Sequence, residues 1–82
     1  MRIVWGAEVE RRLRSIPGGD AAAIRAAVQR FAQAPSDPTP AEGSLIRRLR
    51  VGAYRLVMVL EPDGAAVWVV RLYHADREPF TG

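Results

Sequence analysis

Three apolar segments in the second half of the chain, residues 45–51, 54–61 and 65–73, are separated only by short turn sequences. Gly52-Ala53 lies between the first two segments, and Pro62-Asp63-Gly64 lies between the last two. Apolar runs of this length, bounded by glycine and proline, are typical of β-strands, and connections this short join antiparallel neighbours. The sequence therefore predicts a three-stranded antiparallel meander.

The first half of the chain is predicted to contain one strand and two helices. Residues 2–5 form a short extended run, after which apolar residues recur at helical spacing. Residues 17–19, Pro-Gly-Gly, end this helix, and Asp20 is expected to cap a second helix that runs to about Ala34. The proline-rich residues 35–40 cannot continue a helix and form a connecting segment. The predicted order is β-α-α-β-β-β, an α+β fold with a helical hairpin packed on one face of a small, mainly antiparallel sheet.

Length and composition exclude several classes of site. The 82 residues suffice for one domain, residues 1–82, and a domain of this size buries only about 60% of its unfolded surface. The lack of cysteine excludes disulfides, thiolate zinc sites and thiol catalysis. A single histidine and scattered carboxylates cannot form a ligand cluster, so no metal or other cofactor is predicted. No apolar stretch is long enough for a signal peptide or a membrane span, and we expect a cytoplasmic protein.

The distribution of positive charge is uneven. The chain has 12 arginines and no lysine, and four of the arginines fall within residues 46–55, I-R-R-L-R-V-G-A-Y-R. With Gly52-Ala53 as a two-residue turn, Arg50 pairs with Arg55. Side chains alternate between the faces of a strand, which places Arg48 on the same face as this pair. The helices are expected to cover the opposite face.

The second turn extends this patch. A three-residue loop at residues 62–64 places Arg71 opposite Arg55 on the open face and Trp68 opposite Met58 in the core. A two-residue loop would bury Arg71 without a partner, which is costly, so the three-residue loop is expected. The predicted patch comprises Arg48, Arg50, Arg55 and Arg71, with Val57 and Val69 between them. A polyanion such as phosphate would relieve the repulsion between these cations, while the alternative is a solvated sheet face covered by arginine stems.

The sequence resembles a known family over nearly its whole length. R-V-G-A-Y-R-L-V-M-V-L, followed by a glycine turn, V-W-V-V-R-L-Y-H and a basic residue, is similar to the RelE/ParE superfamily of bacterial type II toxins, whose members carry an R-x-G-x-Y-R-like hairpin. The opening strand with its tryptophan, the helical hairpin and the proline-containing connection also match the order of that family. The resemblance implies a single β-α-α-β-β-β toxin domain. RelE-like members are implied to be mRNA interferases that cut mRNA in the ribosomal A site without a metal.

The resemblance also implies roles for individual residues. Arg55 matches the phosphate-binding arginine of the family, and Arg48 and Arg50 occupy the strand where catalytic lysines or arginines lie. Arg77 most nearly matches the basic residue that protonates the leaving group. His74 has a suitable pKa range for a general base but is expected on the core side of its strand. Glu61 and Glu78 are the alternative bases, although Glu61 is expected at the far end of the sheet.

Further residues are predicted to contact RNA. These are Arg71, Tyr73, which could stack on a base, and Phe80. The usual His-Arg pair of the family is replaced by His74-Ala75-Asp76-Arg77, so the arginine is displaced. The tyrosine-containing tail of many RelE-like members has no counterpart here beyond Phe80.

Two alternative functions share the implied fold. One is a ParE-like inhibitor of DNA gyrase, and the other is a catalytically degenerate member that only binds an antitoxin. The basic face favours the endoribonuclease. The implied partners are the ribosome, mRNA and a cognate antitoxin, whose acidic or amphipathic segment is expected to cover the arginine face or the alanine-rich helix of residues 21–34.

Overall fold

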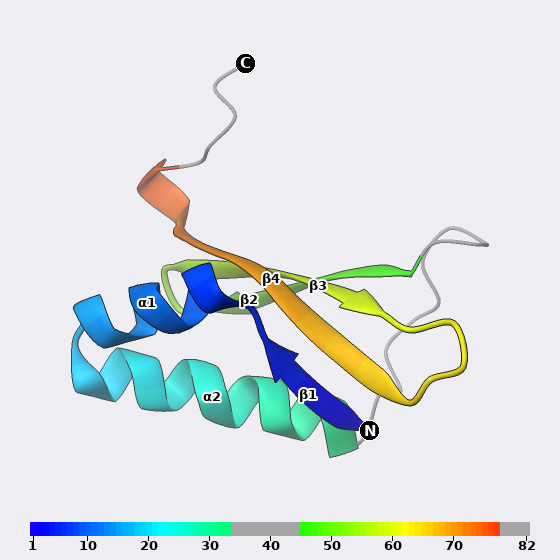
Figure 1. The fold of residues 1–82 in the computed structure, drawn as a ribbon. Coiled ribbons are helices and arrows are strands. Elements are labelled where there is room, and N and C mark those ends of the chain that lie inside the picture. Colours follow the sequence, from blue (N-terminus) through cyan, green and yellow to red (C-terminus); the bar gives the residue numbers. More distant parts are fainter. Residues whose placement is uncertain (34–44, 78–82) are drawn as a thin grey trace.

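The computed structural model describes residues 1–33 and 45–77 of the chain and contains two helices and four strands. In order, the elements are β1 (Arg2–Trp5), α1 (Ala7–Ser15), α2 (Gly18–Gln33), β2 (Ile46–Val51), β3 (Tyr54–Leu60), β4 (Ala66–His74) and a short 3₁₀ helix, η1 (Ala75–Arg77). Both helices lie on one side of the sheet (Figure 1). The predicted order and layer arrangement are confirmed. The expected connecting segment, residues 35–40, lies outside the described residues.

The sheet is open, with the strand order β1-β4-β3-β2. β1 pairs in parallel with the first half of β4, and the other neighbours are antiparallel. The parallel pairing follows from the two helices, which return the chain across the sheet before the meander begins. Gly6 makes the close approach after β1 possible, because its N–H donates to the Val69 carbonyl at 2.9 Å and a Cβ would lie only 3.0 Å from that oxygen. In this strand order β4 lies between β1 and β3, so it is an interior strand.

The core lies between the helices and the sheet and follows the predicted helical stripes. Val9 and Leu13 of α1 and Ile24 and Val28 of α2 are buried. The sheet contributes Leu56, Met58, Val67, Val69 and Leu72 to the same cluster. Apolar burial of this kind is the main favourable term in the stability of a small domain.

A polar contact ties the two helices to β1. The Arg25 Nη2 donates to Glu10 Oε1 at 2.7 Å, which joins α2 to α1. The Arg25 guanidinium carbon lies 5.1 Å from the centroid of the Trp5 ring, within the range of a cation–π contact. Trp5 is thus a packing residue, as predicted.

Asp20 does not have the capping role expected from the sequence. α2 begins two residues earlier, at Gly18, so Asp20 lies in the first turn of the helix. The Asp20 Oδ2 instead accepts a hydrogen bond from the Tyr54 hydroxyl at 3.0 Å. The carboxylate therefore links α2 to β3. The turn between the two helices, at residues 16–17, forms without a cap from Asp20.

The register of the first hairpin is confirmed. Val51 pairs with Tyr54, and Arg50 pairs with Arg55. Gly52 has a φ of 56°, while no described non-glycine residue has a positive φ. A positive φ at only the first of the two turn residues is the pattern of a type II′ turn, whose twist matches that of antiparallel strands.

The predicted register of the second hairpin is wrong. The connection is longer than three residues, because the Glu61 N–H donates to the Ala66 carbonyl at 2.9 Å. Val59 consequently pairs with Trp68, and a bulge follows, since Met58 pairs with Val69 and Val57 with Arg71.

The changed register exchanges two residues between the faces of the sheet. Val69, expected between the arginines on the open face, is buried in the core. Trp68, expected in the core, is 41% exposed on the open face. Val70 has no partner on β3, and both Val70 and Arg71 are exposed.

Truncation of a buried β3 side chain tests this placement of the core. Met58→Ala is expected to lower the free energy of unfolding by about 2–5 kcal/mol, because it removes a buried side chain and leaves a cavity. Val70→Ala, at an exposed position on the neighbouring strand, should change it by no more than about 0.5 kcal/mol. Denaturant titration measures the free energy of unfolding of both variants. Equal losses would contradict the placement of Met58 in the core and of Val70 on the open face.

Candidate functional site

The open face of the sheet carries arginines in two neighbouring rows that cross β2, β3 and β4. One row consists of Arg50, Arg55 and Tyr73, and the next consists of Arg48, Val57 and Arg71. Arg48, Arg50 and Arg71 are exposed, and Arg55 is half-buried. The structure thus brings the four predicted arginines together, with Tyr73 beside them. We call these five residues the arginine face.

The repulsion on this face is smaller than the sequence suggested. Arg50 lies opposite Arg55 as expected, but Arg55 faces Tyr73 rather than Arg71 on its other side. Arg71 instead faces Val57, because the bulge shifts the register of β4. Only one directly opposed pair of like charges remains among the four arginines.

No carboxylate of the described residues neutralises these cations. Within residues 1–33 and 45–77, the four arginines make no ion pair. The Glu61 Oε2 accepts from the Trp68 Nε1 at 2.9 Å, and Asp76 lies beside His74 instead. The arginine face therefore presents positive charge that a bound anion can satisfy.

Arg55 is held in place by its own hairpin. Its Nη1 donates to the Gly52 carbonyl at 3.0 Å and to the Tyr54 carbonyl at 2.9 Å. These two bonds use two of the five N–H donors of a guanidinium and leave Nε and Nη2 for a ligand. A cation restrained in this way loses less conformational entropy when it binds phosphate.

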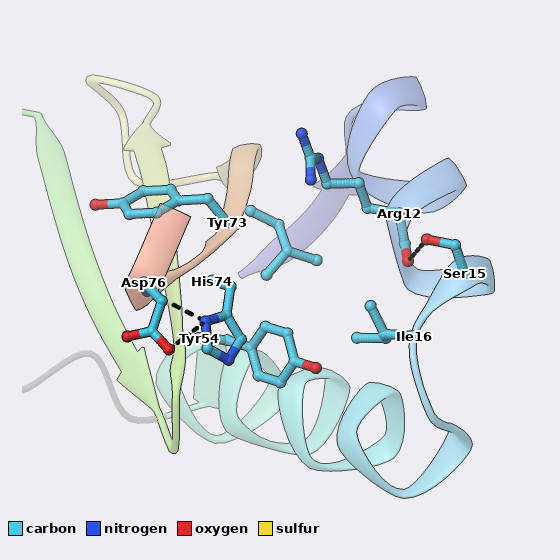
Figure 2. A pocket seen from close by; sticks show the side chains of 8 residues that line it. Arg12, Ser15, Ile16, Tyr54, Tyr73, His74 and Asp76 are labelled. Atoms are coloured by element: carbon cyan, nitrogen blue, oxygen red, sulfur yellow. Dashed lines mark hydrogen bonds and ion pairs between the residues drawn. The ribbon is translucent and has the colours of Figure 1, made fainter. Parts of the chain in front are cut away.

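His74 lies on the other side of β4 from the arginine face. Its ring packs edge-on against Tyr54, with ring centroids 5.3 Å apart and an interplanar angle of 81°. Its Nδ1 accepts a hydrogen bond from the Asp76 N–H at 3.2 Å and lies 3.7 Å from the Asp76 Oδ2. Figure 2 shows Tyr73 and His74 leaving β4 in different directions. The structure therefore does not group His74 with the arginines.

A cleft of about 420 Å³ adjoins the end of β4 (Figure 2). It is lined by Arg12, Ser15, Ile16, Tyr54, Leu72, Tyr73, His74 and Asp76. Tyr73 belongs both to this cleft and to the arginine face. Sequence reasoning missed Arg12, because its place beside β4 depends on how α1 docks and no motif marks it.

The remaining predicted positions lie at the C-terminal end. Arg77 is the last residue of η1, directly after β4, and Phe80 lies outside the described residues. In the described ranges, no three histidine, cysteine, aspartate or glutamate residues are grouped as a metal site requires. None of the helices there is long and apolar enough to cross a membrane.

Comparisons with known proteins identify the fold. No family sequence model and no curated protein matches the chain. Among solved structures, the Escherichia coli RelBE toxin–antitoxin complex matches with a TM-score of 0.73 and 15% identity over 93% of this chain and 98% of that chain.

Two further structures agree with it. The Mycobacterium tuberculosis RelBE2 toxin–antitoxin complex has a TM-score of 0.69 and 22% identity, covering 89% of this chain and 95% of that chain. A mutant of the E. coli toxin RelE in the free state has a TM-score of 0.68 and 14% identity, covering 92% of this chain and 83% of that chain. The chain therefore has the fold of RelE toxins.

The contact between Tyr54 and Asp20 predicts a measurable pKa. The hydrogen bond to Asp20, then burial and the negative charge of Asp20, raise the pKa of Tyr54 above the ordinary 10.0. Because the folded-state pKa is the higher one, the stabilisation from this contact is complete below pH 10.0 and is lost as pH rises through the folded pKa.

Tyrosinate absorbance measures this pKa. In a Tyr73→Phe background, Tyr54 is the only tyrosine that titrates, since the chain has two. Asp20→Asn is expected to lower its pKa towards the ordinary value, because it removes the negative charge. The same titration curve with and without Asp20→Asn would contradict the role of this contact.

Proposed function

We propose that this protein is the toxin of a type II toxin–antitoxin system and that it cleaves mRNA on the ribosome as a metal-independent endoribonuclease. The observation that carries this proposal is the arginine face, whose four arginines make no ion pair with any described residue. The fold shared with RelE toxins supports the same conclusion. Guanidinium groups suit this chemistry because they stay charged and bind phosphate through paired N–H donors.

The proposed reaction is an attack of the 2′-hydroxyl on the neighbouring phosphate. The new P–O bond forms as the bond to the 5′-oxygen breaks, so the products are a 2′,3′-cyclic phosphate and a 5′-hydroxyl. Negative charge accumulates on the phosphorane in between, and cations that are already in place stabilise it most. Arg55, which the hairpin restrains, is the proposed principal stabiliser, with Arg48 and Arg50 alongside.

Two proton transfers complete the reaction, one from the 2′-hydroxyl and one to the leaving 5′-oxygen. His74, the last residue of β4, is the proposed acceptor of the 2′-hydroxyl proton, and Arg77, the last residue of η1, is the proposed donor of the proton to the leaving 5′-oxygen. Because the His74 Nδ1 accepts the Asp76 N–H at 3.2 Å, Nδ1 is the basic nitrogen of the neutral ring, and it takes up the proton of the 2′-hydroxyl when this hydrogen bond opens.

The proposed partners are the ribosome, mRNA and a cognate antitoxin. The E. coli and M. tuberculosis structures that include an antitoxin support an antitoxin for this chain as well. An acidic or amphipathic antitoxin segment would neutralise the exposed arginines and block RNA at the same time.

The experiment that tests this function is primer extension on a reporter mRNA in a translating extract. Wild-type protein is expected to produce cuts within codons that require ribosomes. Arg55→Ala should slow cleavage by about 100-fold or more, because it removes a donor aimed at the developing charge. Arg30→Ala, an exposed arginine of α2 on the other side of the sheet, is the matched control and should leave cleavage unchanged.

Other outcomes point elsewhere. An intact mRNA at excess protein would contradict the endoribonuclease proposal. Inhibition of supercoiling by purified gyrase would then support the ParE-like alternative. Normal cleavage by a folded Arg55→Ala protein would remove Arg55 from the mechanism.

A further inference from the structure

Trp68 is a large aromatic residue on the open face of an interior strand. It is 41% exposed, although the sequence pattern suggested a core position. Its indole Nε1 donates to the Glu61 Oε2 at 2.9 Å, which restrains one edge of the ring. A tryptophan that is both exposed and restrained is suited to contact with a ligand, because little rotamer freedom remains to be lost on binding.

The row that contains Trp68 adjoins the arginines. Val59 pairs with both Ile46 and Trp68, and Trp68 pairs with Val4, so an apolar row crosses all four strands. The next row along the strands contains Arg48 and Arg71. One continuous surface therefore carries an apolar row beside the two rows that contain the arginines.

We propose that Trp68 is a base-stacking residue for the RNA strand whose phosphates lie on the arginine face. This inference rests on the proposed function and extends its binding site beyond the reaction centre. Tyr73 lies on the same face of β4, at the other end of the arginine rows. The RNA strand then runs along β4, with one base against Trp68, phosphates at Arg71 and Arg48, and another base near Tyr73.

The geometry of the sheet fits this path. Neighbouring rows on one face of a strand are about 7 Å apart, so the rows of Trp68 and Tyr73, with one row between them, are separated by about 13 Å. Open four-stranded sheets with aromatic residues on interior strands stack two or three bases in RNA-binding domains. Stacking tolerates any base, because every base has a π-face, so this contact provides affinity without fixing the sequence.

The exposed aliphatic residues of this surface are the main competing observation. Ile46 is 50% exposed and Val70 is 43% exposed, and both would also suit a protein segment. RNA is favoured because arginines occupy the next row and because no described strand residue on this face is acidic; Glu61, which directly follows β3, already accepts the hydrogen bond of the Trp68 indole. The two occupants differ in a testable way: stacking depends on the ring of Trp68, whereas protein docking depends on Trp68 and Ile46 alike.

The test measures binding of a fluorescently labelled hexauridylate RNA to the full chain at low salt. Trp68→Ala is expected to weaken binding by about 5- to 140-fold, which corresponds to about 1–3 kcal/mol for one stacked base. Trp68→Phe should retain most of the affinity, because it keeps an aromatic face. Ile46→Ala should change the affinity less than about twofold, and Arg55→Ala should weaken it through the phosphate contact.

A second signal comes from the tryptophan itself. Trp5 packs on the helix side under Arg25, so Trp5→Phe leaves Trp68 as the only tryptophan while keeping an aromatic ring there. RNA is expected to quench the fluorescence of this variant. If Trp5→Phe does not fold, the affinity series in the natural background decides the question alone.

The outcomes separate this inference from the proposed function. Binding that requires Arg55 but is unaffected by Trp68→Ala overturns the inference and leaves the endoribonuclease standing. Equal losses in Trp68→Ala and Ile46→Ala also overturn it, because apolar contact rather than stacking would then explain the surface. If free RNA does not bind, the test becomes the mRNA concentration at which ribosomal cleavage reaches half of its maximal rate. The same concentration for Trp68→Ala and for the wild type overturns the inference, and a higher concentration for Trp68→Ala supports it. The absence of both binding and cleavage counts against the inference and the function together.

Discussion

The bulge at Val70 determines which residues share the open face of this sheet. Because Met58 pairs with Val69 and Val57 pairs with Arg71, one residue of β4 has no partner. A bulge of this kind reverses the alternation of side chains beyond it. Val69 and Leu72, three positions apart, therefore both reach the core, while Trp68 and Arg71 both reach the open face. Without the bulge, either Trp68 or Arg71 would point towards the helices.

The helices keep the opposite face closed through a few specific contacts added to the apolar core. The Tyr54 hydroxyl holds α2 through Asp20, and Arg25 joins α2 to Glu10 of α1 and to the ring of Trp5. The bond between Tyr54 and Asp20 anchors β3, the strand that carries Arg55, so the arginine face rests on a supported sheet rather than on a loop. A positioned set of cations stabilises developing charge better than a mobile one, since less reorganisation accompanies the reaction.

The structure divides the candidate chemistry between two sides of β4. The arginines and Tyr73 occupy the open face, whereas His74 packs against Tyr54 on the helix side and borders a cleft to which Tyr73 also contributes. In the proposed reaction, the electrostatic stabilisation of the phosphate by the arginines does not depend on His74. The same fold can carry different activities, and the site residues decide between them.

The sequence by itself determined the element order, the helical stripes of the core and the register of the first hairpin. Those features depend on local signals: helical periodicity, turn residues, and a two-residue connection at Gly52 that permits a single register. The bulge, the exposure of Trp68, the link from Asp20 to Tyr54 and the position of His74 were decided only by the tertiary structure. Each depends on which side chains fill the space between the sheet and the helices, and that competition involves residues far apart in the chain.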